Sequence, residues 1–181
     1  MALPSAAELP SPREPGAPYR VCLVCLGNIC RSPMAETVLR AELAAAGLDG
    51  AVVVDSAGTG DWHVGDTMDP DARKALAGRS LDGSAHRARQ FEPSWLSRYD
   101  LILAMDSRNL ADLRRMARAQ GEATDRIRLF GEVGGLTDTG TRDIPDPWGG
   151  GPDEFGHVLD LLGEAAPIIA TRLARRLETA G

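Results

Sequence analysis

Apolar residues gather in short runs along this chain, and longer amphipathic stretches lie between them. Four runs are rich in Val, Ile and Leu, the residue types of strands buried on both faces; they are 21–24, 51–54, 101–105 and 127–130. The stretches that fit helices are 33–46, a short one from 69, 107–120 and 153–177. Strands that alternate with helices predict one α/β domain with a parallel sheet, right-handed crossovers and helices on both faces. In such sheets, ligands bind beyond the carboxyl ends of the strands.

Polar residues, glycine and proline mark the expected ends of these elements. The expected N-caps are Ser32, Asp69 and Ser107. A long irregular stretch over 131–152 is rich in Gly, Asp and Thr, and loops of that length in compact domains are usually functional or disordered. Pro167 is expected to kink or divide the last helix.

The first eighteen residues differ in composition from the rest. They hold five of the twelve prolines and lack both a basic start and an apolar segment. We therefore expect a disordered leader over 1–18, rather than a signal peptide, and one domain over 19–181. The chain carries 26 acidic and 20 basic residues, a net charge of −6, which argues against a nucleic-acid partner. No apolar run approaches the length of a membrane span, so we expect no membrane partner.

Between the first strand and the first helix, the chain combines a cysteine, a tight loop and an arginine. Cys25 leaves the strand, residues 26–30 turn, and Arg31 arrives where the helix begins. Successive backbone N–H groups in such a loop form an anion-binding nest, and the helix start adds donors and partial positive charge. The guanidinium of Arg31 matches two oxygens of a phosphate. An oxyanion held there would lie against the Cys25 sulfur, and the same field favours the nucleophilic thiolate over the thiol.

Residues 25–36, Cys-Leu-Gly-Asn-Ile-Cys-Arg-Ser-Pro-Met-Ala-Glu, resemble the signature of the low-molecular-weight protein tyrosine phosphatases. The resemblance extends from about residue 20 to the C-terminus. It implies a three-layer domain whose four-stranded, twisted parallel sheet has the order 2-1-3-4. It also implies metal-independent hydrolysis of phosphotyrosine and small aryl phosphates through a cysteinyl-phosphate. No cofactor is expected, the partner is a tyrosine-phosphorylated protein, and the chain is expected to be a monomer or a weak dimer.

The phosphate-binding loop that this resemblance implies supplies both the nucleophile, Cys25, and the donors that hold the phosphate. The phosphate-binding residues are Leu26, Gly27, Asn28, Ile29, Cys30 and Arg31. An arginine at a helix start is otherwise disfavoured, so its presence there favours a bound anion.

Cleavage of a phosphate ester by a thiolate also needs a proton donor for the leaving oxygen. Chemistry alone does not choose among Asp143, Asp146 and Asp153, which lie in or beside the late loop. Asp146-Pro147-Trp148 resembles the Asp-Pro-Tyr segment of the family, in which the Asp is the general acid. We therefore assign Asp146 and keep Asp143 as the alternative.

The few aromatic residues include two tryptophans on polar loops, where a role in the core explains them poorly. Trp62 lies in a Gly/Asp-rich loop after the second strand, and Trp148 follows the presumed acid. Two rings beside a phosphate-binding loop would form a slot for a flat substrate such as phosphotyrosine. Trp148 stands where the family usually has tyrosine, and Gly149 where a second aromatic residue is often found. Trp95, in a helical context, is expected to pack.

The resemblance further implies a set of hydrogen-bonding residues that hold the loop in shape: Asn28, Ser32, Ser56 and His86. Asn28 is expected at a left-handed position, which Asn tolerates better than most residues.

Cysteine and histidine usage completes the expected site. The resemblance implies a reversible, protective disulfide between Cys25 and Cys30, whereas Cys22 is expected in the core. These three cysteines cannot staple the whole fold, which fits a reducing, cytoplasmic location. His63 and His157 have no partners by spacing, and metal-binding templates are absent, so no metal is expected.

Two other functions remain open from the sequence alone. An arsenate reductase on the same fold would relay a disulfide through downstream cysteines, and none follows Cys30. A phosphoprotein-binding module without turnover would lack the nucleophile or the acid. Nucleotide binding through a Gly-Lys-Ser/Thr loop is excluded, because that sequence does not occur.

Overall fold

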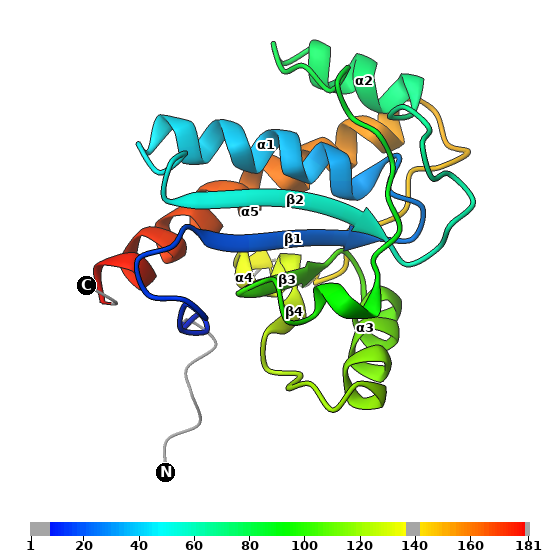
Figure 1. The fold of residues 1–181 in the computed structure, drawn as a ribbon. Helices are drawn as coiled ribbons and strands as arrows, with labels where there is room; N and C mark the ends of the chain where they lie inside the picture. The colour runs from blue at the N-terminus through cyan, green and yellow to red at the C-terminus, as the bar shows by residue number, and fades with distance from the viewer. Residues whose placement is uncertain (1–7, 137–141, 180–181) are drawn as a thin grey trace.

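The computed structural model describes residues 8–136 and 142–179. Figure 1 shows a central sheet with helices packed around it. The strands are β1 (Tyr19–Cys25), β2 (Val52–Gly58), β3 (Leu101–Ala104) and β4 (Ile127–Leu129). The helices are α1 (Arg31–Ala45), α2 (Pro70–Ala77), α3 (Ser107–Ala119), α4 (Phe130–Val133) and α5 (Pro152–Glu178), with a 3₁₀ turn at Pro93–Trp95.

All strand pairs in the sheet are parallel, and their order is β2-β1-β3-β4. The predicted fold class and strand order are therefore confirmed. Parallel strands end at the same edge, so the loops that follow β1 and β2 leave the sheet side by side, at the right of the sheet in Figure 1.

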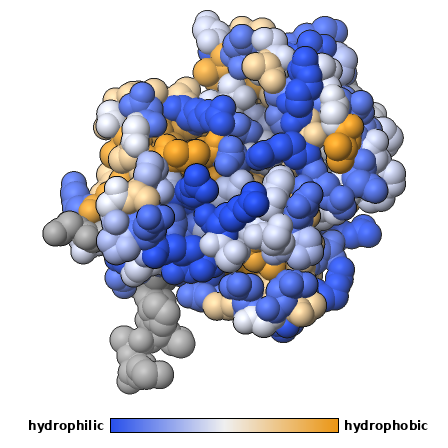
Figure 2. All heavy atoms as spheres, viewed as in Figure 1, coloured by the Kyte–Doolittle hydropathy of each residue, from blue (hydrophilic) through white to orange (hydrophobic). Residues whose placement is uncertain are grey.

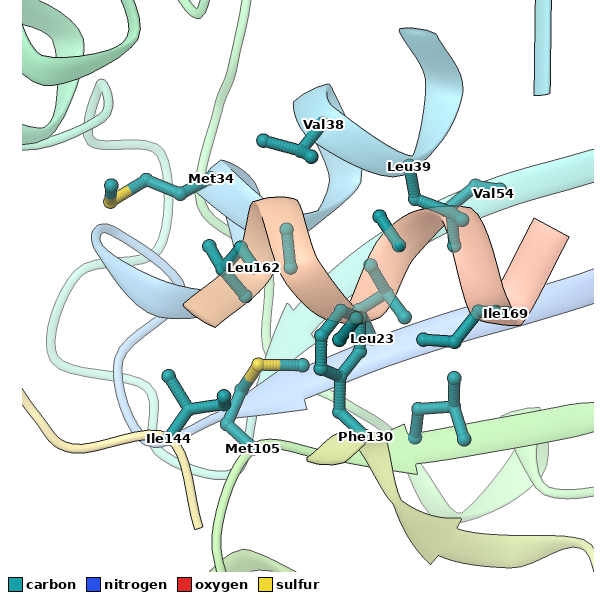
Figure 3. Packing of buried hydrophobic residues seen from close by; sticks show 14 of the residues in the cluster. Leu23, Met34, Val38, Leu39, Val54, Met105, Phe130, Ile144, Leu162 and Ile169 are labelled. Carbon is teal, nitrogen blue, oxygen red and sulfur yellow. The ribbon is translucent and has the colours of Figure 1, made fainter. Parts of the chain in front are cut away.

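Alternate residues of β1 point to opposite faces and build two separate cores. Val21 and Leu23 join the larger cluster, which α1, α2, α4 and α5 cover. Figure 3 shows its centre, where Leu23 lies beside Phe130 and beneath residues of α5. Cys22 and Val24 face the smaller cluster with α3 and the segment before β3. The predicted three layers are thus present, and Cys22 is fully buried as expected. The face of the molecule shown in Figure 2 is mostly hydrophilic, with a few apolar patches.

Two of the predicted helix caps, Ser32 and Ser107, are wrong. Helix α1 begins at Arg31, so Ser32 lies inside the first turn, where its hydroxyl bonds other groups. Helix α3 begins at Ser107, and its cap is Asp106, whose carboxylate accepts from the Asn109 backbone N–H. The cap at Asp69 is confirmed.

Other predicted elements also differ from the structure. The second strand runs on to Gly58, because parallel pairing with β1 continues as far as Cys25. Helix α5 is one element that contains Pro167, so this proline does not divide it. The irregular stretch 131–152 begins inside the short helix α4, and its residues 137–141 lie outside the described residues.

The expected disordered leader is wrong for residues 8–18. Leu9 is buried in the larger cluster. The backbone N–H of Arg13 donates to the Asp100 carboxylate at 2.6 Å. An apolar anchor and a charge-assisted hydrogen bond hold a proline-rich segment that has no secondary structure of its own. Residues 1–7 lie outside the described residues.

None of the helices in 8–136 and 142–179 combines the length and the apolar character that crossing a membrane requires.

Candidate active site

The loop after β1 folds back closely on the end of β2. A Cβ atom at Gly58 would lie 2.6 Å from the Leu26 carbonyl oxygen and 3.0 Å from the Asn28 nitrogen. Only glycine therefore allows this approach. Cys25 lies at the base of the loop and is 3% exposed. Its sulfur lies 3.3 Å from the Asn28 nitrogen, which donates to it, and 3.0 Å from the Ser32 hydroxyl. In the contact with Ser32 either group can be the donor, and the Ser32 hydroxyl also lies within 3.3 Å of the Ala57 carbonyl, to which it can donate.

Most backbone N–H groups of this loop are not used within the protein. Among the described residues, no acceptor is present for the amides of Leu26, Gly27, Ile29, Cys30 and Arg31. Backbone donors without a partner, beside a helix start, are what an oxyanion site requires.

Asn28 holds the loop through every polar group it has. Its φ of 57° confirms the predicted left-handed position. Its side-chain amide donates to Ser32 Oγ and to Ser56 Oγ, each at 2.9 Å. Its side-chain oxygen accepts from the Arg89 backbone N–H at 2.8 Å. Its backbone oxygen lies 2.7 Å from His86 Nε2. A residue in an uncommon backbone conformation is thus fixed from several sides.

The structure brings together the four supporting residues that the sequence indicated and adds two more. Glu36 accepts a hydrogen bond from Ser56 Oγ, and Arg89 donates to the Ser56 carbonyl. Burial lowers the pKa of His86, so its imidazole is neutral at pH 7 and can donate from Nε2 to the loop carbonyl.

Arg31 is buried although it carries a charge. Its Nη1 donates to Asp106 Oδ2 at 2.6 Å and to the Ile144 carbonyl at 3.1 Å, and its Nη2 lies 3.5 Å from Asp146 Oδ2. Burial by itself would lower the pKa of Arg31, but the negative charges of Cys25, Asp106 and Asp146 raise it above its ordinary value. The guanidinium therefore stays charged inside the site.

Cys30 shares the loop with Cys25 and is also buried. Both cysteines are free thiols. Burial raises the pKa of the Cys30 thiol, and the nearby Asp69 carboxylate acts in the same direction. Cys30 is therefore protonated at neutral pH.

A cavity of about 160 Å³ opens over Cys25. It is lined by Cys25, Leu26, Gly27, Ile29, Cys30, Arg31, Trp62, His63, Asp146 and Trp148. Both predicted slot residues lie at its mouth, where Trp62 is 70% and Trp148 65% exposed. The indole of Trp62 lies so close over Gly60 that any Cβ there would overlap it. Trp95, by contrast, packs against Phe91 and Tyr99, as expected.

The two candidate acids lie in different surroundings. Asp146 lines the cavity, and its side chain is 47% exposed. Asp143 instead accepts from the backbone N–H and the hydroxyl of Ser107, at 3.1 and 2.8 Å. The loop between them is anchored by Ile144, which is fully buried and whose N–H donates to the Met105 carbonyl at 2.8 Å. The geometry therefore favours Asp146 as the acid.

Besides Glu36 and Arg89, sequence reasoning missed two further residues at this site. His63 was expected to have no partner, but its Nδ1 lies 3.0 Å from Asp66 Oδ2, and its ring lies over Gly27 in the cavity wall. Its place beside Trp62 was a usable signal. Asp106 was hidden because its partner, Arg31, is 75 residues away. Within 8–136 and 142–179, no group of three or more His, Cys, Asp or Glu side chains could hold a metal ion.

Comparisons with known proteins agree with this geometry. Residues 20–179 match the family described as "Low molecular weight phosphotyrosine protein phosphatase". The chain is 44% identical over 160 residues to a "Low molecular weight protein-tyrosine-phosphatase" of Streptomyces coelicolor, covering 88% of this chain and 96% of that one.

Solved structures agree as well. A protein tyrosine phosphatase from Entamoeba histolytica, with Hepes in its active site, superimposes with a TM-score of 0.80 at 31% identity, covering 87% of this chain and 97% of that one. The arginine phosphatase YwlE, in a cysteine-to-serine variant with a phosphorylated active-site serine, gives 0.74 at 30% identity, covering 87% and 99%. Sequence, fold and the loop at the end of β1 therefore agree that this chain belongs to the low molecular weight protein tyrosine phosphatases.

Proposed function

We propose that the cavity over Cys25 hydrolyses phosphotyrosine in two steps, with Cys25 as nucleophile, Arg31 as phosphate ligand and Asp146 as proton donor. The observation that carries this proposal is that these three residues, from three separate segments, line one cavity. The unpaired loop amides and Arg31 hold three phosphate oxygens, and the thiolate lies behind the phosphorus.

In the first step the Cys25 sulfur attacks phosphorus in line with the phenolic oxygen. The S–P bond forms while the P–O bond breaks, and Asp146 gives its proton to the leaving phenolate. Negative charge spreads over the equatorial oxygens in the transition state, and fixed donors already point to them, so little reorganisation is needed.

In the second step water releases the phosphate. Asp146, now ionised, takes a proton from water as the water oxygen attacks the cysteinyl-phosphate, and the Cys25 thiolate leaves. The phosphorylated active-site serine in the cysteine-to-serine variant of YwlE supports a covalent intermediate in that protein. No step in this sequence uses a metal.

The shape of the cavity favours a flat aromatic ester. Trp62 and Trp148 flank the mouth above a buried sulfur, so the phosphate must reach down past both rings. A tyrosine side chain is long enough and can contact the indoles, whereas a serine side chain is short. We take the substrate to be a tyrosine-phosphorylated protein in the cytoplasm, where the three thiols stay reduced.

The test compares three peptides of one sequence that carry phosphotyrosine, phosphoserine or phosphoarginine, in the presence of a chelator and without added metal. We expect release of phosphate from the phosphotyrosine peptide with the highest kcat/KM. A requirement for added metal, or a preference for either other peptide, would contradict the proposal.

Cys30 is proposed to protect Cys25 from irreversible oxidation. Peroxide converts the Cys25 thiolate to a sulfenic acid, and the Cys30 thiol then condenses with it to form a disulfide and water. Because Cys30 stays protonated, it does not compete for phosphorus in the reduced enzyme. An external thiol reduces the disulfide and restores both thiols.

Recovery after peroxide therefore depends on Cys30. We expect wild-type enzyme to lose activity in peroxide, more slowly when phosphate fills the site, and to regain it with dithiothreitol. The Cys30→Ala variant should lose activity and regain little, because oxidation of Cys25 proceeds past the sulfenic acid. Activity is followed with p-nitrophenyl phosphate before and after reduction. Normal recovery of the Cys30→Ala variant would show that Cys30 has no protective role.

A further inference from the structure

The phosphate-binding arginine is held from behind by a carboxylate that the two-step reaction does not use. Asp106 Oδ2 accepts from Arg31 Nη1 at 2.6 Å, and the Ile144 carbonyl accepts from the same nitrogen at 3.1 Å. The side chain of Arg31 is 4% exposed and that of Asp106 is 22% exposed. A short, largely desolvated contact between charged groups is among the strong hydrogen bonds in proteins.

Asp106 uses its two oxygens for two different partners. Oδ1 accepts from the Asn109 backbone N–H at 2.7 Å and so caps helix α3, while Oδ2 takes Arg31. Since each oxygen of the carboxylate is held by a different partner, the carboxylate can rotate little, and the orientation of the helix is passed on to the guanidinium.

The backbone on which Asp106 sits is fixed as well. The preceding residue, Met105, donates its N–H to the Val24 carbonyl at 2.9 Å and accepts from the Ile144 N–H at 2.8 Å. Figure 3 shows the Met105 and Ile144 side chains next to each other at the edge of the larger core. Asp106 therefore extends from a segment that is tied both to β1 and to the loop that carries Asp146.

Arg31 lies between two carboxylates, Asp106 and Asp146, so the direction of its guanidinium depends on which of them it pairs with. Among the described residues, the polar partner of Arg31 Nη2 is Asp146, at 3.5 Å. A guanidinium free to turn would pair more closely with Asp146, and that pairing would keep both groups from the substrate. With Nη1 committed to Asp106, Nη2 stays directed into the cavity, where phosphate can replace the longer contact.

We propose that Asp106 is a positioning residue that orients the Arg31 guanidinium for the substrate phosphate. This rests on the proposed function, in which Arg31 binds the phosphate. The role of Asp106 is exerted through Arg31, and no contact with substrate is required.

The experiment separates this role from helix capping by the choice of replacement. Asp106→Ser keeps a good N-cap side chain but is too short and uncharged to hold Arg31, whereas Asp106→Ala loses both contacts. Asp112→Ala, which removes a half-buried aspartate paired with the exposed Arg115 on the same helix, is the matched control. For each variant one measures the inhibition constant of inorganic phosphate, kcat and KM with p-nitrophenyl and phenyl phosphate, and the melting temperature.

We expect the Ser and Ala variants to bind phosphate equally poorly, about tenfold or more weaker than wild type, since a hydrogen bond between charged groups contributes that much. KM should rise by a similar factor for both esters, because Arg31 acts on the phosphate rather than on the leaving group. Both variants lose the partner of a buried guanidinium and should melt earlier than wild type, but Asp106→Ala also loses the helix cap and should melt earlier than Asp106→Ser. Asp112→Ala should match wild type in phosphate affinity.

If Asp106→Ser binds phosphate as wild type does, Asp106 is only a cap and the proposal is wrong. A loss confined to phenyl phosphate would also overturn it, since that would place Asp106 in control of the acid. Arg31→Ala serves to locate a failure. If Arg31→Ala binds phosphate normally, the role of Arg31 in the proposed function is wrong. If Arg31→Ala binds phosphate poorly while Asp106→Ser binds it normally, only the positioning role of Asp106 is wrong.

Discussion

Replacing Cys25 with serine should abolish turnover and leave oxyanion binding in place. The hydroxyl of serine is a far weaker nucleophile than a thiolate, while the loop amides and Arg31 do not depend on sulfur. We expect kcat for p-nitrophenyl phosphate to fall by at least about a thousandfold, as losses of a nucleophile do. Phosphate binding is measured by tryptophan fluorescence, because Trp62 and Trp148 flank the cavity.

Cys22→Ala is the matched control for this experiment. Cys22 lies three residues earlier on the same strand, but its side chain faces the smaller core on the other side of the sheet. Its loss should cost stability through a small cavity and leave kcat close to wild type. Residual activity of Cys25→Ser above about a thousandth of wild type would place the nucleophile elsewhere. Loss of phosphate binding in that variant would mean that the sulfur itself shapes the loop.

The parts of the site that lie close together in sequence could be predicted from it. The nucleophile, the loop and Arg31 occupy 25–31, so strand-to-helix geometry alone brings them to one anion site. Trp62 and Trp148, which line the cavity, could be singled out because large apolar rings on polar loops are unusual. The choice of Asp146 over Asp143 rested on the resemblance, since both lie in one irregular loop without periodicity.

The parts that could not be predicted depend on contacts between distant segments. From the local sequence, Ser32 resembles an N-cap. The loop Cys25–Arg31 sets the start of α1 instead, and the Ser32 hydroxyl accepts a hydrogen bond from the Asn28 side chain within that loop. A leader rich in proline gives no sign that Leu9 fits a space in the core. The role of Asp106 is invisible in sequence, because Ser107 beside it is an equally good cap and Arg31 lies far away.

Replacing Asp146 with asparagine should slow esters with poor leaving groups far more than those with good ones. Asparagine keeps the size and the loop geometry but cannot donate the proton that a phenolate with a high pKa requires. For phosphotyrosine and phenyl phosphate we expect kcat/KM to fall about a hundredfold to a thousandfold, within the range for general acids. For p-nitrophenyl phosphate, whose leaving group departs as an anion, the fall in kcat/KM should be about tenfold or less. The measurement is a plot of log kcat/KM against leaving-group pKa, which should become steeper in the variant.

Asp143→Asn is the matched control, because it makes the same chemical change three residues away in the same loop. Asp143 bonds Ser107 through Oδ1, and an asparagine oxygen can accept those same hydrogen bonds. The fall in kcat/KM for Asp143→Asn should therefore be smaller than for Asp146→Asn, and it should be equal for all esters. Equal losses across leaving groups in Asp146→Asn would rule out the acid role of that residue, and a steep dependence in Asp143→Asn would transfer the role there. Since only Asp146 lines the cavity beside Arg31, the steep line should belong to that variant alone.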